Sequence, residues 1–314
     1  MTSPDPRRDR AFSTRDALAA GMTRAELRRH DLQQFFHGAR ARGLDESEVR
    51  HRALAYMPRM VERAAFSHVT AARLWGMPLP LWSKKSRELH VSVPSGRAPR
   101  GRGVLGHCTS ELGRPRTVAG LRLVHPALAW AQCAESLDVA DLVAAGDFAV
   151  TGDPLHDIPA PTTIAALRRA AGLLDGRRGS ARRAQALELI RIGSISRPES
   201  LSRLLFVSSG LPEPELNLEL RDARGTRIAV LDQAWPEFRV GYDYDGREHT
   251  TVERFRRDLA RAGAVGDERW AHVRGTALDL FDQPEALVRR LAIRLGDGGW
   301  RGRTHSSRFT PFER

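Results

Sequence analysis

The chain has 314 residues, with 50 Lys or Arg against 38 Asp or Glu and a formal net charge of +12. This length allows two or three domains with cores of their own, and the positive charge favours a nucleic-acid partner over a membrane. No run approaches the ~18 apolar residues of a membrane span, so we expect a cytoplasmic protein with no membrane partner. Only Lys84 and Lys85 are lysines, and an arginine bias of this kind also arises in GC-rich genomes.

The two cysteines, Cys108 and Cys133, are separated by 24 residues and form no CxxC pair. This spacing argues against a zinc knuckle and a disulfide framework. We expect two reduced, buried thiols.

Residues 11–45 predict a winged helix-turn-helix. Ser13 or Thr14 can cap a short helix that ends at Gly21, and a second helix is expected over 23–30. A β-hairpin wing is expected over 32–42. In this interpretation four arginines contact DNA, namely Arg24, Arg28, Arg29 and Arg40. The alternative is a helical hairpin whose arginines form a solvated face.

Residues 46–153 predict a mixed α/β middle domain. The helical period runs over 46–74, strand and turn patterns follow over 76–126, and helices are expected at 127–136 and 138–149. His90, His107 and His125 lack metal-ligand spacing, so we interpret them as structural residues. A linker and a basic helix are expected over 154–196.

The last third, residues 197–297, predicts the element order αβββαβα. Helices are expected at 198–209 and 284–295, on either side of four strands near 216–221, 227–232, 238–244 and 270–274. A further helix is expected between the last two strands.

Four groups capable of metal chemistry lie within Ile228–His249, and they are Asp232, Asp243, Asp245 and His249. Residues two apart in a strand share a face, so Asp243 and Asp245 should point away from Tyr242 and Tyr244. Carboxylates in this arrangement can hold Mg²⁺ for phosphodiester cleavage. The alternative is a solvated hairpin edge. A regular hairpin that turns at Trp235 and Pro236 would pair Asp232 with about residue 239, so a shared metal site requires a bend or an offset register.

Two sets of motifs resemble known families. RPESLSRLL (197–205), LDQAWPE (231–237), YDYDGREH (242–249) and WAHVRGT (270–276) resemble a bacterial endonuclease-like domain of unknown function. That domain is related to the very-short-patch-repair endonucleases of the restriction-endonuclease-like superfamily. FSTRDALAAGMTRAELRRH and SHVTAARLWGMPLP resemble the N-terminal winged-helix region of abortive-infection type antitoxin regulators.

The C-terminal resemblance implies a restriction-endonuclease-like αβββαβ core and a Mg²⁺- or Mn²⁺-dependent endodeoxyribonuclease. Asp232 and Asp243 would be metal ligands, Glu199 the helix carboxylate, and Asp245 and His249 further catalytic residues. Arg257 and Arg261 would hold DNA phosphates.

Asp245 stands where the superfamily usually has lysine, and no lysine occurs beyond Lys85. A second interpretation is therefore a non-catalytic transcriptional regulator or antitoxin of a toxin–antitoxin or phage-defence system, with a toxin protein as partner. An RNA-directed nuclease is a third.

Overall fold

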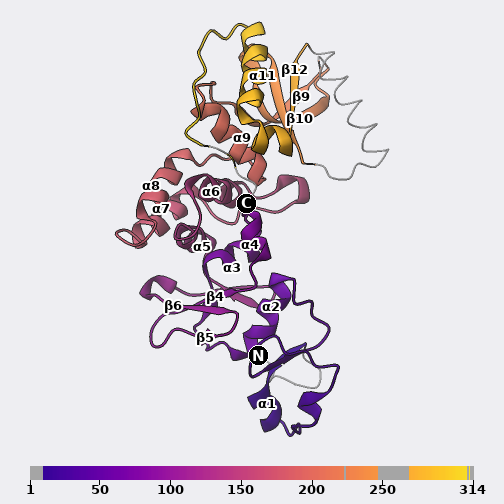
Figure 1. Ribbon diagram of the computed structural model, residues 1–314, viewed down its shortest axis with the longest axis vertical. Helices are drawn as coiled ribbons and strands as arrows, with labels where there is room; N and C mark the ends of the chain where they lie inside the picture. Colours follow the sequence, from indigo (N-terminus) through magenta and orange to yellow (C-terminus); the bar gives the residue numbers. More distant parts are fainter. Residues whose placement is uncertain (1–9, 223, 247–268, 310, 312–314) are drawn as a thin grey trace. The chain divides into compact units, whose positions relative to one another are not determined.

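The structure is a computed structural model that describes residues 10–222, 224–246, 269–309 and 311 (Figure 1). The chain divides into two compact units. Unit 1 contains the described residues of Met1–Met77, Trp82–Leu137 and Thr162–Arg183, and unit 2 those of Pro78–Leu81, Asp138–Pro161 and Ala184–Arg314. The expected mixed α/β architecture is confirmed in both units. The expected domain boundaries differ from these units, because the helix at 139–151 belongs to unit 2 and the helix at 164–173 belongs to unit 1.

Unit 1 begins with a two-stranded antiparallel sheet and a short helix that lies between its two strands in the sequence. The sheet pairs β1 (Ala11–Ser13) with β2 (Ala39–Ala41), and α1 (Thr14–Ala19) follows β1 directly. The second expected helix is only the three-residue 3₁₀ turn η1 (Glu26–Arg28). Leu27 is the one buried apolar residue of that segment, which is too little apolar surface to hold two helical turns against a core.

Unit 1 also contains a six-stranded sheet with strand order β5-β6-β4-β3-β8-β7. Its strands are β3 (Ala65–Phe66), β4 (Leu89–Val93), β5 (Arg100–Gly101), β6 (Val104–Cys108), β7 (Arg116–Val118) and β8 (Leu121–Leu123). The helices of this unit are α2 (Val49–Tyr56), α3 (His68–Leu74), α5 (Pro126–Cys133) and α7 (Ile164–Leu173), with short 3₁₀ turns η2 (Met57–Arg59) and η3 (Ser110–Leu112). Two further helices, α4 (Leu81–Lys85) and α8 (Ser180–Leu189), each contain residues of both units.

One hydrophobic core joins the N-terminal segment to the six-stranded sheet. Phe36, Ala39 and Leu44 are buried together with Phe66 and Val91. Residues 11–45 therefore share a core with the sheet that follows them. The prediction of helix over 46–74 is wrong in the middle of that range, because β3 lies there and pairs with β4 and β8.

Unit 2 contains a four-stranded sheet in the order β12-β11-β10-β9. Its strands are β9 (Glu215–Arg221), β10 (Arg227–Trp235), β11 (Val240–Asp245) and β12 (Ala271–Thr276). The first three strands in the chain are antiparallel neighbours, whereas β11 and β12 run parallel.

The sheet of unit 2 packs against helices through a core that includes Leu205, Phe206, Trp235, Tyr242 and Leu291. The helices are α6 (Val139–Thr151), α9 (Arg197–Ser208) and α11 (Pro284–Asp297), with 3₁₀ turns η4 (Pro154–His156) and η5 (Pro236–Phe238) and a π-helical turn η6 (Leu278–Asp282). Every described helix is too short or too polar to cross a bilayer.

Candidate functional site

The turn between β10 and β11 sets which acidic residues face each other. Proline cannot donate to a strand ladder, and the chain leaves β10 at Pro236–Phe238. The amide of Arg239 donates to the carbonyl of Pro236 at 3.1 Å, and Arg239 adopts a left-handed conformation with φ +53°. This longer turn corrects the expected pairing: Asp232 lies across from Asp243, not from residue 239.

The two strands part at these aspartates. The last residue pair of the ladder is Gln233 with Tyr242. Beyond it, the amide of Asp232 donates to Asp243 Oδ1 at 2.9 Å, and the amide of Tyr244 donates to Asp232 Oδ2 at 2.8 Å. Each carboxylate thus takes the place of a backbone carbonyl as acceptor, and two negative groups converge where the sheet opens.

Alternation along β11 puts the tyrosines and aspartates on opposite faces, as the sequence predicts. Tyr242 is fully buried and meets Phe206 edge to face, with ring centroids 4.9 Å apart. Tyr244 is half-buried against the same core. Asp243 and Asp245 remain only partly covered, and Asp245 is paired in register with Thr276 on β12.

His272 on β12 is a residue that the sequence interpretation missed. Its Nε2 lies 2.9 Å from Asp243 Oδ2, and the two side chains are 9% and 14% exposed. The parallel register pairs Gly241 with His272, so the histidine is two positions from the partner of Asp243 and on the same face. The motif WAHVRGT contains His272 and could have drawn attention to it. Its position beside Asp243 depends on the register of the parallel strands β11 and β12, which local sequence does not fix.

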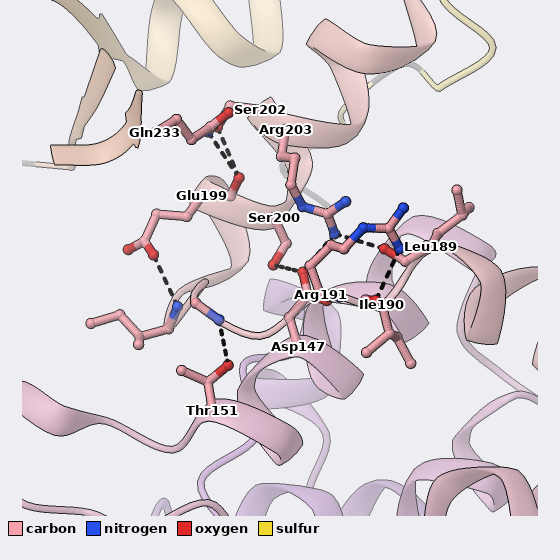
Figure 2. A network of polar contacts seen from close by, with 12 residues as sticks. Asp147, Thr151, Leu189, Ile190, Arg191, Glu199, Ser200, Ser202, Arg203 and Gln233 are labelled. Carbon is pink, nitrogen blue, oxygen red and sulfur yellow. Dashed lines mark hydrogen bonds and ion pairs between the residues drawn. The ribbon is translucent and has the colours of Figure 1, made fainter. Parts of the chain in front are cut away.

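Glu199 lies in the first turn of α9 and has a clear capping role (Figure 2). Its Oε1 accepts from the Ser196 hydroxyl at 2.6 Å, and its Oε2 accepts from the Ile195 amide at 2.9 Å. Burial raises the pKa of Glu199, and the nearby charge of Asp243 raises it further, while these hydrogen bonds oppose the shift. Glu199 is therefore electrostatically linked to the opening between β10 and β11.

A buried network fixes α9 and hence Glu199 (Figure 2). Asp147 on α6 accepts from Ser200 Oγ at 2.7 Å and forms an ion pair with Arg203 at 2.8 Å, with both partners of the pair almost fully buried. Gln233 on β10 donates to the Glu199 carbonyl at 3.2 Å. Helix α9 is thereby tied to both α6 and the strand that carries Asp232.

Asp232 and Asp243 are the acidic residues of unit 2 whose side chains both reach across the opening, and together they could hold a divalent ion. Mg²⁺ is bound through one or two carboxylates and keeps several waters, which suits two converging aspartates. Glu199 would act at longer range. In the described ranges, the one group of at least three His, Cys, Asp or Glu ligand atoms that all lie within 4.8 Å of one another is a histidine cluster in unit 1.

The expected DNA-contacting arginines of unit 1 differ in their surroundings. Arg24, Arg28 and Arg29 are exposed. Arg40 is half-buried, and its Nε donates to the carbonyl of Leu27 at 2.8 Å, so its guanidinium links β2 to η1. The remaining expected site residues, His249, Arg257 and Arg261, lie outside the described residues.

No protein-family model and no solved structure matches this sequence. Two relatives from Mycobacterium tuberculosis do match it: uncharacterized protein MT2308 of strain CDC 1551 / Oshkosh, and uncharacterized protein Rv2248 of strain ATCC 25618 / H37Rv. Each is 30% identical over 121 residues, which is 38% of this chain and 44% of the relative. The chain thus spans less than half the length of these curated relatives, whose names state no activity.

Proposed function

We propose that this chain is a DNA-binding protein whose unit 2 hydrolyses DNA phosphodiesters with Mg²⁺ or Mn²⁺. The observation that carries the proposal is the opening between β10 and β11, where Asp232 and Asp243 converge. Glu199 adds a third carboxylate whose raised pKa reflects burial and the charge of Asp243. Like charges gathered at one place are costly unless a cation joins them.

Asp232 and Asp243 would hold the metal, and when bound it would offset phosphate charge and activate water. His272 supplies a group that can move a proton, because its Nε2 is oriented by Asp243 at 2.9 Å. This assignment gives His272 a catalytic role of the kind that the C-terminal resemblance implied for His249. It also supplies an alternative to the lysine that the superfamily usually carries. Asp245, at the end of β11, would support the same edge.

The positive charge of the chain supports a DNA partner. The formal net charge is +12, and exposed arginines at 24, 28 and 29 lie on or beside η1. Arginines of this kind bind phosphates and make affinity depend on salt. We propose this N-terminal segment as part of a winged-helix DNA contact, and the sheet order of unit 2, with its preceding α9, supports a restriction-endonuclease-like core.

A second candidate is a non-catalytic regulator or antitoxin that binds DNA and a toxin protein. The observation in its favour is that the three carboxylates of the site already accept hydrogen bonds that stabilise the fold. Asp232 and Asp243 accept backbone amides across the opening, and Glu199 caps α9. Such a set can hold a fold together without a metal.

The test is cleavage of nicked, mismatched and supercoiled DNA by the wild-type chain and by Asp232→Asn, with Mg²⁺, Mn²⁺ or EDTA. Asp297→Asn is the control, because the Asp297 side chain is 66% exposed in the same unit. We expect metal-dependent cleavage by the wild type and the control, and none by Asp232→Asn. Equal cleavage by all three overturns the nuclease assignment. Salt-sensitive DNA binding without cleavage supports the non-catalytic regulator. Cleavage of RNA alone in a parallel assay identifies the chain as an RNA-directed nuclease.

A further inference from the structure

Three imidazoles from separate elements of unit 1 form a compact cluster. His68 begins α3, His90 lies on β4 and His107 lies on β6. One ring nitrogen of each lies within 4.8 Å of the other two, and His90 Nδ1 is 3.0 Å from His107 Nε2. The rings of His68 and His107 stack with centroids 3.8 Å apart. The sequence interpretation treated His90 and His107 as separate structural residues, did not single out His68, and so missed the cluster.

The sheet register and one strained residue create this arrangement. Strands β4 and β6 are parallel, with Leu105 opposite His90, so His90 and His107 lie on one face two positions apart. His68 has φ +50°, a left-handed conformation that is costly for a residue with a side chain. Residues held in such conformations concentrate at functional sites, because the surrounding structure must enforce them.

Hydrogen bonds around the cluster orient its rings. Ser67 Oγ lies 2.9 Å from His68 Nδ1 and accepts from Ser92 Oγ at 2.8 Å. The backbone amide of His68 donates to Gln132 Oε1 at 3.1 Å. In the tautomer in which His68 Nδ1–H donates to Ser67 Oγ, His68 Nε2 keeps the lone pair that a metal needs. Outer partners of this kind fix the tautomer and orientation of metal-binding histidines.

The local environment favours neutral rings. Burial lowers the pKa of all three histidines, and the proximity of His107 lowers it further for His68 and His90, where the His90 value falls to about 4. Neutral imidazole is the form that binds metals.

We propose that His68, His90 and His107 form a binding site for a transition-metal ion of the Zn²⁺ class. Imidazole ligands prefer Zn²⁺, Co²⁺, Ni²⁺ or Cu²⁺ over Mg²⁺ and Ca²⁺. Zn²⁺ binds imidazole nitrogen at about 2.0–2.1 Å, so tetrahedral ligand atoms lie roughly 3.3 Å apart. The 3.0 Å contact between His90 Nδ1 and His107 Nε2 is close to this spacing. Binding would replace that hydrogen bond and would require the stacked rings to rotate until all three nitrogens face the ion.

A carboxylate or a water can complete the coordination. Glu135 Oε1 lies 4.0 Å from His68 Nε2, and the Glu135 side chain is 39% exposed. His90 and His107 are only partly buried, which leaves a route for the ion. A bound ion would fasten α3 to two strands and stabilise unit 1. This site uses unit 1 alone, so it can fail or succeed independently of the carboxylate site in unit 2.

The test is Zn²⁺ titration of the full chain without a polyhistidine tag, after metal removal, in competition with a chromophoric chelator. The variants are His90→Gln, His107→Gln and Ser67→Ala, with His30→Gln as the control because His30 is an exposed histidine of the same unit. Co²⁺ absorption in the visible range reports the coordination geometry, and far-ultraviolet circular dichroism of the metal-free variants reports folding.

We expect one tight Zn²⁺ per wild-type chain, a higher Tm with Zn²⁺ and no competition from Mg²⁺. Loss of either imidazole should weaken binding about 100-fold or more, and Ser67→Ala about 10-fold, while His30→Gln behaves as wild type. If the wild type binds Zn²⁺ no more tightly than folded His90→Gln or His107→Gln, the cluster is a hydrogen-bonded histidine group and the proposal is overturned. If one of these variants does not fold, the other decides.

Discussion

Asp243 accepts the backbone amide of Asp232 through its side chain, at the level where β10 and β11 cease to pair. The bond is matched in the opposite direction, because Asp232 accepts the amide of Tyr244. Two backbone donors that a continued ladder would have satisfied are instead satisfied by carboxylates. The carboxylate oxygens that fix the geometry of the opening therefore also give it negative charge. Aspartate-to-asparagine variants keep the hydrogen-bond acceptor and remove the charge, so they separate the structural role from the metal-binding role.

Replacement of His272 tests its proposed part in proton transfer. His272→Gln keeps a hydrogen-bonding group beside Asp243 but cannot exchange a proton in the same way. General acid–base catalysis typically contributes about 100-fold or more, so we expect the single-turnover cleavage rate to fall by about that factor. Mn²⁺ affinity should change far less. His305→Gln, at an exposed histidine of unit 2, is the control. A rate that matches the control removes His272 from the mechanism.

The buried ion pair between Asp147 and Arg203 should stabilise unit 2. Asp147→Asn removes the buried carboxylate from the Arg203 guanidinium, which still has the 42% exposed Glu213 at 3.6 Å. Loss of one partner of a buried ion pair costs about 3 kcal/mol or more. We expect a lower urea midpoint and faster hydrogen exchange in peptides from α9. The matched control is Asp297→Asn, which breaks an exposed pair with Arg294 and should leave exchange in α9 unchanged. Equal effects of the two variants would show that burial of the first pair is unimportant.

DNA affinity should depend on the exposed arginines of unit 1. We expect Arg28→Ala and Arg29→Ala each to lower the slope of log affinity against log salt by about 0.9, which is the loss of one phosphate contact. Arg40→Ala should instead destabilise unit 1, because its guanidinium donates to the Leu27 carbonyl. Fluorescence anisotropy over a salt series measures the slopes, and thermal unfolding measures the stability. Unchanged slopes for both exposed positions would exclude this surface as the DNA contact.

The two cysteines should react very differently with a thiol reagent. Cys108 is exposed, whereas Cys133 is fully buried in α5, and burial raises the pKa of its thiol. We expect one thiol per folded chain to react and two in denaturant, as measured by mass after alkylation. The exposed position of Cys108 already corrects the expectation of two buried thiols, and the labelling tests it in solution. Rapid labelling of Cys133 in the folded chain would contradict the core packing around α5.

The described helices and strands of the last third were predictable because they have strong local periodicity. The helix expected between the last two strands lies outside the described residues. The helix expected at 198–209 is observed as Arg197–Ser208, and the strand expected at 227–232 begins at Arg227. Ser196 and Pro198 mark the start of that helix. Where the local signal was weak, pairing decided the outcome: β3 lies inside a stretch with helical period and is held by its neighbours in the sheet.

The candidate sites depend on contacts that local sequence does not encode. The four acidic residues Glu199, Asp232, Asp243 and Asp245 were identified from their motifs, but the pairing of Asp232 with Asp243 depends on a turn closed by left-handed Arg239. Likewise, His68, His90 and His107 have no metal-ligand spacing in the chain, because three separate elements bring them together. Sequence patterns indicate which residues share one face of a strand or helix. The register between strands, and the side chains that it brings together, are set by tertiary pairing.

The most direct test of the central claim is the Mn²⁺ affinity of Asp243→Asn, measured by electron paramagnetic resonance in a His90→Gln background that disables the imidazole cluster. Asparagine can still accept the Asp232 amide, so the opening should keep its shape while it loses charge. If Asp232 and Asp243 share a cation, Asp243→Asn and Asp232→Asn should each weaken Mn²⁺ binding about 100-fold relative to the His90→Gln parent. Parent-like affinity in both variants would contradict the account.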